Sequence, residues 1–207
     1  MSTELTLYDF LPSGNGYKVR LLLSHLQRPY QLKEINILQG ESRTAEFLQL
    51  NPNGRIPVID DSGFVLAESN AILWYLAENT PYFPRQKPLQ AKILQWMFFE
   101  QYSHEPFIAT SRFWISCLQQ KEKYRAQLEQ KKPGGLAALS IMDKHLATQE
   151  FFVGNRYSIA DIALYAYTHV AEEGEFPLQD YPHILAWLKR VEAMPGYVSL
   201  NSFLQAN

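Results

Sequence analysis

The feature that most limits the fold is a sequence of three local patterns between residues 5 and 37. Leu5–Tyr8 is a short apolar run that favours a strand, and turn-forming residues follow it. Apolar residues then recur at helical spacing up to Pro29: Val19, Leu22, Leu23 and Leu26. Tyr30–Ile37 alternates apolar and polar residues, as a half-buried strand does. A strand, a helix and a strand in this order predict a right-handed parallel crossover.

A short helix and a hairpin are predicted after this unit. Thr44–Leu50 has the length of a short helix that its first residue can cap. Ile56–Asp60 and Gly63–Leu66 then predict two short strands joined by a turn. A further helix begins at Ser69, with Ile72, Leu73, Tyr75 and Leu76 on its apolar side. The resulting order, βαβ, α, ββα, predicts a small α/β domain with helices on the faces of a mixed sheet.

The rest of the chain is predicted to be helical. Residues 79–88 contain three prolines and no periodicity, which is typical of a linker. Five helical segments follow: Leu89–Cys117, Tyr124–Gln130, Gly135–Gln149, Ser158–Ala171 and Ile184–Met194. The fourth of them begins with a pattern typical of a capping box, Ser158–Asp161. We therefore expect an α/β domain of residues 1–80, a linker of residues 81–88 and an all-helical domain of residues 89–207.

Charge and cysteine content argue against several classes of function. The 207 residues carry 19 Lys+Arg and 21 Asp+Glu, a net charge of -2, whereas nucleic-acid binders normally show a basic surplus. The N-terminus has no basic start followed by an apolar run, and no stretch reaches the ~20 apolar residues of a membrane span. The single cysteine, Cys117, excludes an internal disulfide and a multi-cysteine metal site. We expect a cytoplasmic protein without a membrane, nucleic-acid or metal partner.

Proline enters the first strand of the predicted hairpin at Ile56-Pro57. Because proline has no N–H, it belongs at a strand start or at a bend rather than in a central ladder. One interpretation is a proline that simply begins the strand. The other is a cis peptide bond. Its bend would turn the backbone N–H and C=O of Ile56 outward, where they could pair with a peptide ligand as an added strand does.

Glu68 and Ser69 lie between the second hairpin strand and the helix that follows. Serine is a favourable N-cap and an acidic residue suits the first turn, so capping alone could explain the pair. Free N–H groups at a helix N-terminus also bind a carboxylate. Since Glu68 can pair with an ammonium group, a ligand with both groups on one carbon would satisfy both residues.

Residues 13–16 (SGNG) begin the first predicted helix. Backbone amides and small hydroxyl or amide side chains at a helix start stabilise an anion, and a thiolate is such an anion. A hydroxyl of Ser13 that donates to sulfur would favour the thiolate and lower the thiol pKa. A helix-capping turn would explain the same residues.

Taken together, four segments resemble the cytosolic glutathione transferase family: LTLYDFLPSGNGYKVRLLL, NPNGRIPVI, LAESNAILWYLAE and SIADIALY. The resemblance covers essentially the whole chain. It implies a thioredoxin-like N-terminal domain, an all-helical second domain and a homodimer. The loop with Ser13 and Asn15 is similar to that of the bacterial serine/asparagine-loop subgroup.

The resemblance implies how glutathione would bind. Pro57 is expected to be cis, with the backbone of Ile56 paired to the cysteinyl part of glutathione. Glu68 and Ser69 are expected to hold the γ-glutamyl end. Arg43 suits the glycyl carboxylate, although an exposed loop arginine fits this position equally well.

The residue that activates the thiol differs among subfamilies. Tyrosine-type transferases use a tyrosine just after the first strand, which makes Tyr8 a candidate. When the helix starts are aligned, Ser13 falls where serine-type transferases have their hydroxyl. The expected catalytic residue is therefore Ser13, with Asn15 as co-stabiliser or substitute.

The function implied is that of a glutathione transferase, in which the thiolate of glutathione attacks a small electrophile. A thiol pKa is typically about 8.5, and hydrogen-bond donors would lower it by ~2. Glutathione would be a co-substrate, with no bound cofactor, and the second partner a small electrophilic or peroxide substrate. Two alternatives use the same fold: a glutathione-dependent peroxidase or disulfide reductase, and a non-catalytic glutathione-binding or regulatory protein.

Overall fold

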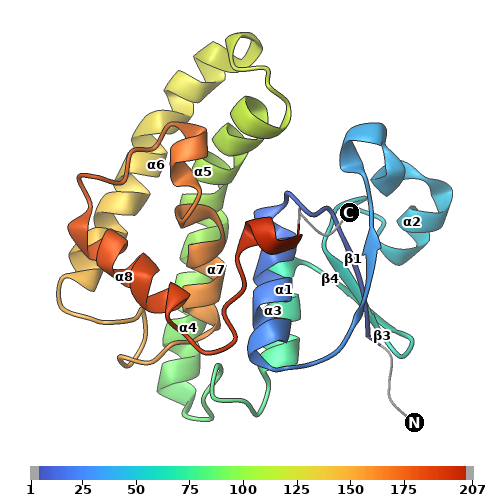
Figure 1. The fold of residues 1–207 in the computed structure, drawn as a ribbon, viewed down its shortest axis with the longest axis horizontal. Coiled ribbons are helices and arrows are strands. Elements are labelled where there is room, and N and C mark those ends of the chain that lie inside the picture. The colour runs from blue at the N-terminus through green and yellow to red at the C-terminus, as the bar shows by residue number, and fades with distance from the viewer. Residues whose placement is uncertain (1–4, 204–207) are drawn as a thin grey trace. The chain divides into compact units, whose positions relative to one another are not determined.

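A computed structural model describes residues 5–203, which divide into two compact units (Figure 1). The first unit combines the residues up to Glu78 with those from Pro195 on, and the second is Asn79–Met194. The first unit contains a four-stranded mixed sheet with helices, and the second is all-helical. The predicted fold class is therefore confirmed. The segment from Pro195 on groups with the first unit rather than with the helices of the second unit, unlike the expected domain of residues 89–207.

The sheet of the first unit has the strand order β2-β1-β3-β4. Its strands are β1 (Leu5–Asp9), β2 (Gln31–Glu34), β3 (Val58–Asp61) and β4 (Phe64–Ala67). β1 pairs in parallel with β2 and antiparallel with β3, which pairs antiparallel with β4. Helix α1 (Gly14–His25) connects the parallel pair. The predicted strand–helix–strand unit and the predicted hairpin are both confirmed.

Helices cover the two faces of this sheet unequally. α1 and α3 (Ser69–Ala77) lie on one face, and the short helix α2 (Ala45–Leu50) lies on the other (Figure 1). Thr44 caps α2 as predicted, because its Oγ1 accepts from the N–H of Phe47 at 3.3 Å. In β1, odd-numbered residues are buried and even-numbered residues are partly exposed, so neighbouring side chains face different layers.

The predicted half-burial of the second strand is wrong. All four residues of β2 are exposed. β2 lies at the edge of the sheet, paired only with β1, whereas the buried strand residues lie mainly on the central strands β1 and β3. Alternation of apolar and polar residues predicted the strand itself, but not whether a second layer covers it.

The C-terminal segment of the first unit runs along α1. Tyr17 Oη donates to the carbonyl of Val198 at 2.6 Å, and Ser24 Oγ donates to the carbonyl of Gly196 at 2.8 Å. Gly196 has a φ of +81°, and a Cβ there would lie 3.2 Å from the Cα of His25. These long-range bonds attach the described part of the C-terminus to the first unit.

The second unit consists of five α-helices and short irregular turns between them. The helices are α4 (Lys87–Phe99), α5 (Glu105–Arg112), α6 (Arg125–Leu146), α7 (Ile159–Thr168) and α8 (Pro182–Glu192). Two π-helical turns, Glu100–His104 and Phe113–Cys117, flank α5 within the segment predicted as one long helix. Within residues 5–203, no helix combines the length and the apolar character needed to cross a membrane.

The predicted break between two helices near residue 133 is wrong, because α6 is continuous through Pro133. Two glycines follow that proline, and helix propensity alone would end the helix there. A Cβ on Gly134 would lie 2.4 Å from the Phe107 ring, and one on Gly135 would lie 2.2 Å from the Phe176 ring. The glycines therefore allow two aromatic rings to approach the helix closely, and this packing offsets their low propensity.

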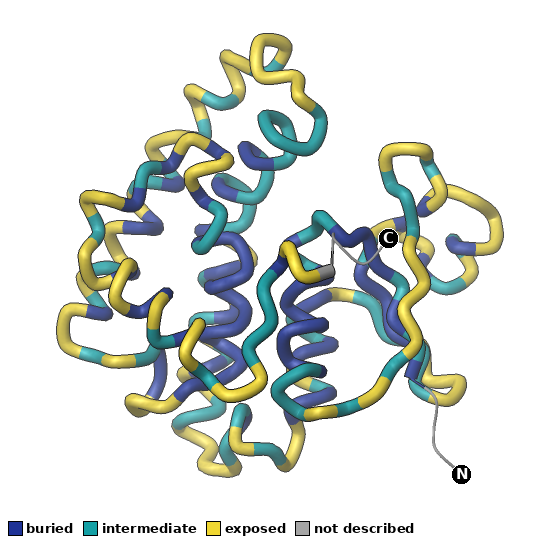
Figure 2. Tube along the Cα trace, in the orientation of Figure 1, coloured by how far each residue is buried: buried dark blue, intermediate teal, exposed yellow. Residues whose placement is uncertain are grey.

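All ten residues of α7 are buried, and the helix lies at the core of the second unit (Figure 2). The predicted capping box is confirmed. The side chain of Ser158 accepts from a backbone N–H of the first turn, and the side chain of Asp161 accepts from the backbone N–H of Ser158. Asp161 also accepts from the N–H of Phe152 at 3.1 Å and from Nε1 of Trp187 at 3.0 Å. Burial raises the pKa of Asp161 to about 6. This carboxyl group thus connects three segments of the core.

Candidate functional site

The candidate site lies in the first unit, where the N-terminal ends of α1 and α3 come together. Ser69, the first residue of α3, is 5% exposed, and its Oγ lies 3.2 Å from Oδ1 of Asn15 in α1. The two residues are 54 positions apart in the sequence. The structure therefore brings together two residues that the sequence singled out separately.

Ser13 is the N-cap of α1. Its Oγ accepts from the N–H of Gly16 at 3.4 Å, and its own N–H donates to the carbonyl of Phe10 at 2.7 Å. The residue is partly exposed. A hydroxyl that accepts one bond still has its hydrogen to donate. Capping of the helix and donation to a ligand are therefore compatible at this residue.

Glu68 occupies the N-cap position of α3, with no capping bond from its side chain. The expectation that Ser69 is the N-cap of this helix is therefore wrong. The backbone of Glu68 has φ 70° and ψ 111°, a conformation that costs a non-glycine residue of order 1–3 kcal/mol. Its side chain is exposed. Such strain is found preferentially where a ligand is bound.

The peptide bond between Ile56 and Pro57 is cis. Pro57 is buried, Ile56 is partly exposed, and β3 begins only at Val58. The cis interpretation is thus confirmed, and the proline belongs to a bend before the strand. Asn51 stabilises this bend, since its Nδ2 donates to the carbonyl of Arg55 at 2.7 Å.

Arg43 is exposed and lies against the turn that precedes this bend. Its Nη1 donates to the carbonyl of Asn53 at 2.9 Å. A Cβ on Gly54, which has a φ of +62°, would lie 2.5 Å from the same nitrogen. A neutral carbonyl holds the guanidinium in place and leaves its positive charge in position to attract an anion.

Tyr8, the alternative activating residue, is on the α2 face of the sheet. Its ring packs edge-on against Phe47 of α2, with centroids 6.4 Å apart. Its hydroxyl accepts from Nζ of Lys33 in β2 at 3.4 Å. The next residue, Asp9, instead faces α1. The structure therefore does not group the Tyr8 hydroxyl with Asn15 and Ser69.

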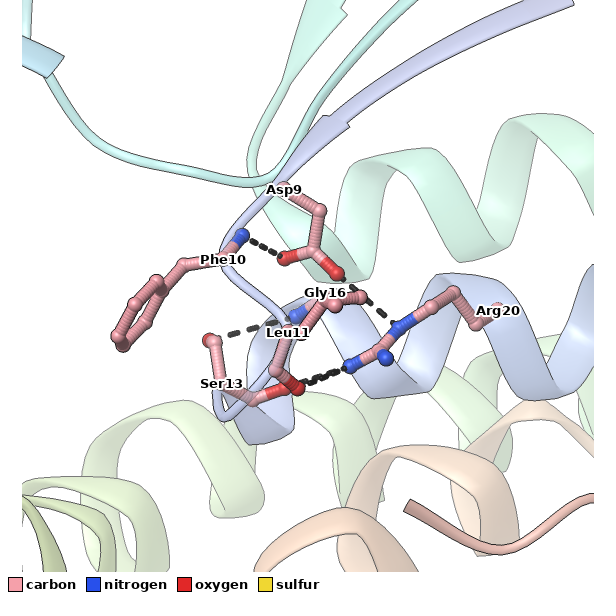
Figure 3. Close-up of polar contacts among 6 residues, drawn as sticks. All are labelled: Asp9, Phe10, Leu11, Ser13, Gly16 and Arg20. Carbon is pink, nitrogen blue, oxygen red and sulfur yellow. Dashed lines mark hydrogen bonds and ion pairs between the residues drawn. The ribbon is translucent and has the colours of Figure 1, made fainter. Parts of the chain in front are cut away.

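A buried ion pair underlies the loop that contains Ser13 (Figure 3). Nε of Arg20 lies 3.0 Å from Oδ2 of Asp9, and both side chains are completely buried. Nη2 of Arg20 also donates to the carbonyls of Leu11 at 2.8 Å and Ser13 at 3.3 Å. Asp9 accepts from the N–H of Phe10 at 2.7 Å. Asp9 thus holds the start of the loop, and Arg20 holds the part of the loop that ends at Ser13.

Sequence reasoning missed Asp9, Arg20 and Lys18. Lys18 is completely buried, and its Nζ donates to Oγ of Ser69 at 3.3 Å. The sequence did contain a signal for them, because these three charged residues lie in otherwise apolar segments. Charged residues are rarely fully buried unless they are paired. Lys18 also lies three positions after Asn15, on the same face of the helix.

Burial raises the pKa of Asp9 to about 7, although the positive charge of Arg20 opposes the rise. We expect this carboxyl group to contribute stability at acidic pH and to lose it as the pH rises from about 4 to about 7. The reason is that the folded protein then keeps a proton that the unfolded chain, with a pKa near 3.8, has released.

Urea unfolding of the wild type and of Asp9→Asn across this pH range would measure the effect. The difference in free energy of unfolding between the two proteins should change with pH, with the wild type losing relative stability toward pH 7. A difference that is constant across the range would contradict the assignment. Asp161 titrates in both proteins, so its contribution cancels.

The described residues contain no group of three or more His, Cys, Asp or Glu side chains that could hold a metal ion. Cys117 is a free, partly exposed thiol, and burial raises its pKa.

Comparison with known families covers both units. The family model described as glutathione S-transferase, N-terminal domain, matches residues 3–78. The model described as glutathione S-transferase, C-terminal domain, matches residues 89–195.

Individual relatives agree with these matches. The crystal structure of a glutathione S-transferase from Pseudomonas fluorescens is 46% identical and superposes with a TM-score of 0.93, covering 95% of this chain and 98% of its own. Glutathione S-transferase 1 of Schizosaccharomyces pombe is 28% identical over 93% of each chain. The disulfide-bond oxidoreductase YfcG of Escherichia coli is 29% identical over 90% of each chain.

Proposed function

Because the chain belongs to the glutathione S-transferase family, we propose that it is a glutathione transferase that activates the thiol of glutathione for attack on a small electrophile. The observation that carries the proposal is the hydrogen bond between Ser69 and Asn15. It joins the residue proposed to hold the glutamyl end to a residue proposed to stabilise the sulfur. In this family glutathione is a co-substrate rather than a bound cofactor.

The proposed binding mode uses each end of the tripeptide. The exposed carboxylate of Glu68 would pair with the glutamyl ammonium group, and the backbone N–H groups at the start of α3, including that of Ser69, would bind the adjacent carboxylate. The backbone of Ile56, at the cis bend, would pair with the cysteinyl part. Arg43 would attract the glycyl carboxylate.

The proposed chemistry is ionisation of the thiol before the attack. Hydrogen bonds donated by Ser13 and Asn15 to the sulfur would stabilise the thiolate selectively and lower its pKa. The thiol proton leaves to solvent, and the sulfur forms a bond to the electrophilic carbon as the leaving group departs with its electron pair. Assignment to the serine/asparagine-loop subgroup, the homodimer and the cytoplasmic location remain predictions.

One relative favours a second candidate function. The disulfide-bond oxidoreductase YfcG of E. coli matches nearly the whole chain. The same thiolate could attack a disulfide or a hydroperoxide, in which case glutathione is oxidised and the acceptor is reduced. A non-catalytic glutathione-binding protein would use the same binding residues without turnover.

Ser13→Ala provides the test of the proposed mechanism. We expect the variant to bind glutathione, but with about a 100-fold lower kcat/KM, since loss of one donor to a developing anion typically has an effect of this size. Titration calorimetry would measure binding. Assays with an aryl halide, a hydroperoxide and a mixed disulfide would measure turnover and separate the two enzymatic functions.

The matched control is Ser140→Ala, an exposed serine in α6 that should leave binding and turnover unchanged. A wild type that binds glutathione but turns over none of the three acceptors would support the non-catalytic alternative. Full activity in Ser13→Ala would mean that Ser13 does not activate the thiol, and Asn15→Ala would then be tested in the same assays.

A further inference from the structure

Lys18 has no role in the proposed binding mode, but its side chain contacts Ser69, which belongs to the site. The side chain is completely buried in α1, where a lysine must give up its hydration. Its ammonium group donates to Oγ of Ser69 at 3.3 Å. The same oxygen lies 3.2 Å from Oδ1 of Asn15. Lys18, Ser69 and Asn15 thus form a chain of hydrogen bonds from the interior to the site.

The chemistry of the donors sets the direction of this chain. An ammonium group can only donate, so Ser69 accepts from Lys18 and directs its own hydrogen elsewhere. The partner at 3.2 Å is Oδ1 of Asn15, which can only accept. Because the amide oxygen of Asn15 is engaged in this way, its –NH₂ group is directed away from Ser69. The orientation of the amide follows from the network.

We propose that Lys18 is a positioning residue, which fixes the Ser69 hydroxyl as a donor and thereby orients the Asn15 amide with its –NH₂ toward the sulfur of bound glutathione. This inference rests on the proposed function, since it requires glutathione at the site. It extends that function by linking the glutamyl end to the thiol end of the site through a buried cation. A change at Lys18 should therefore alter the pKa of the bound thiol, although the contact that Lys18 makes in this chain is with Ser69.

A purely structural role for Lys18 makes a different prediction. If the lysine only filled space or supported α1, its loss would change stability and leave the ionisation of bound glutathione unaltered. If its charge acted directly on the sulfur, its loss would have the same effect with or without Asn15. Only the proposed chain requires that the effect of Lys18 pass through Asn15.

The experiment measures the pKa of the bound glutathione thiol from the ultraviolet absorbance of the thiolate as a function of pH. Lys18→Met, which keeps an unbranched side chain without a donor, should raise this pKa by about 1, a typical effect of losing one hydrogen bond to the charged form. Asn15→Ala should raise it by a similar amount. The double variant should match Asn15→Ala, because the two residues act in series.

Lys33→Met is the matched control, because it removes an exposed lysine of β2 on the opposite face of the sheet. Its thiol pKa should equal that of the wild type. Lys18→Gln is a second variant for the case in which Lys18→Met does not fold, as judged by circular dichroism. The glutamine amide can accept as well as donate, so the direction of the chain is lost and the thiol pKa should again rise.

Two results would overturn the inference. One is a folded Lys18 variant that binds glutathione with the wild-type thiol pKa. The other is an effect of Lys18→Met that is equally large in the Asn15→Ala background. A wild type that does not bind glutathione, or binds it without forming thiolate at neutral pH, would instead contradict the proposed function.

Discussion

Replacing Gly16 with alanine is expected to destabilise the protein by about 3 kcal/mol or more, the upper range for a methyl group forced into a packed interior. A Cβ at this position would lie 1.6 Å from Oδ1 and 1.9 Å from Cγ of Asp9. Distances this short require one of the two groups to move.

Asp9 has little freedom to move away. Its carboxylate accepts from the N–H of Phe10 at 2.7 Å and pairs with Arg20 at 3.0 Å, and both charged side chains are completely buried. A shift of the carboxylate would weaken both contacts in a region that water does not reach. The glycine therefore allows the start of α1 to approach the end of β1 closely enough for the pair to form.

Chemical unfolding monitored by circular dichroism would measure this effect, with Gly40→Ala as the control. Gly40 also requires glycine for its backbone, with a φ of +80°, but a Cβ there meets nothing within 4 Å. The control should lose only about 1 kcal/mol, the cost of a left-handed conformation in a residue with a Cβ. Equal losses in the two variants would show that contact with Asp9 is not the cause.

Arg20→Met is expected to destabilise the protein by about 3–5 kcal/mol, as is typical when one partner of a buried ion pair is removed. The methionine leaves the carboxyl group of Asp9 without its counter-charge. The carbonyls of Leu11 and Ser13 also lose the donor that holds them at 2.8 and 3.3 Å. Because these carbonyls belong to the loop that contains Ser13, thiol activation should decrease as well.

A partly exposed ion pair on the same unit provides the control. Arg28 lies 2.8 Å from Asp61, but the two side chains are 32% and 11% exposed. Arg28→Met should therefore cost less than Arg20→Met, since solvent reaches this pair and screens it in part. Urea unfolding of both variants would give the comparison.

The double variant Asp9→Asn/Arg20→Met separates the two causes of the loss. Replacing both side chains should recover part of the stability lost in Arg20→Met, because no buried carboxyl group remains without its partner. Thiol activation should stay low, because the loop carbonyls still lack their donor. A double variant less stable than Arg20→Met would show that the carboxyl group of Asp9, left without its partner, is not a cause of the loss.

Local sequence patterns correctly predicted most of the backbone. The strand, helix and strand of residues 5–37 and the hairpin near Gly63 follow from periodicity and turn residues, which depend on neighbours in the chain. The bend at Pro57 follows from the missing N–H of proline. Ser13 was placed at a helix start for the same kind of local reason.

Tertiary packing decided where local preference was weak or misleading. α6 continues through Pro133 because two aromatic rings pack closely against the glycines that follow it, and this packing offsets their low helix propensity. β2 is exposed because it lies at the sheet edge. The segment from Pro195 joins the first unit through bonds to α1, between residues more than 170 positions apart.

The site shows the same division between local and long-range information. Local patterns alone were enough to predict that small polar and acidic residues begin α1 and α3, because a helix start has a local signature. Only the tertiary structure placed Asn15 beside Ser69, Lys18 beneath them and Arg20 against Asp9. Contacts of this kind join residues that are not neighbours in the chain. A charged side chain that is buried needs a specific partner, and the composition of the chain cannot identify that partner.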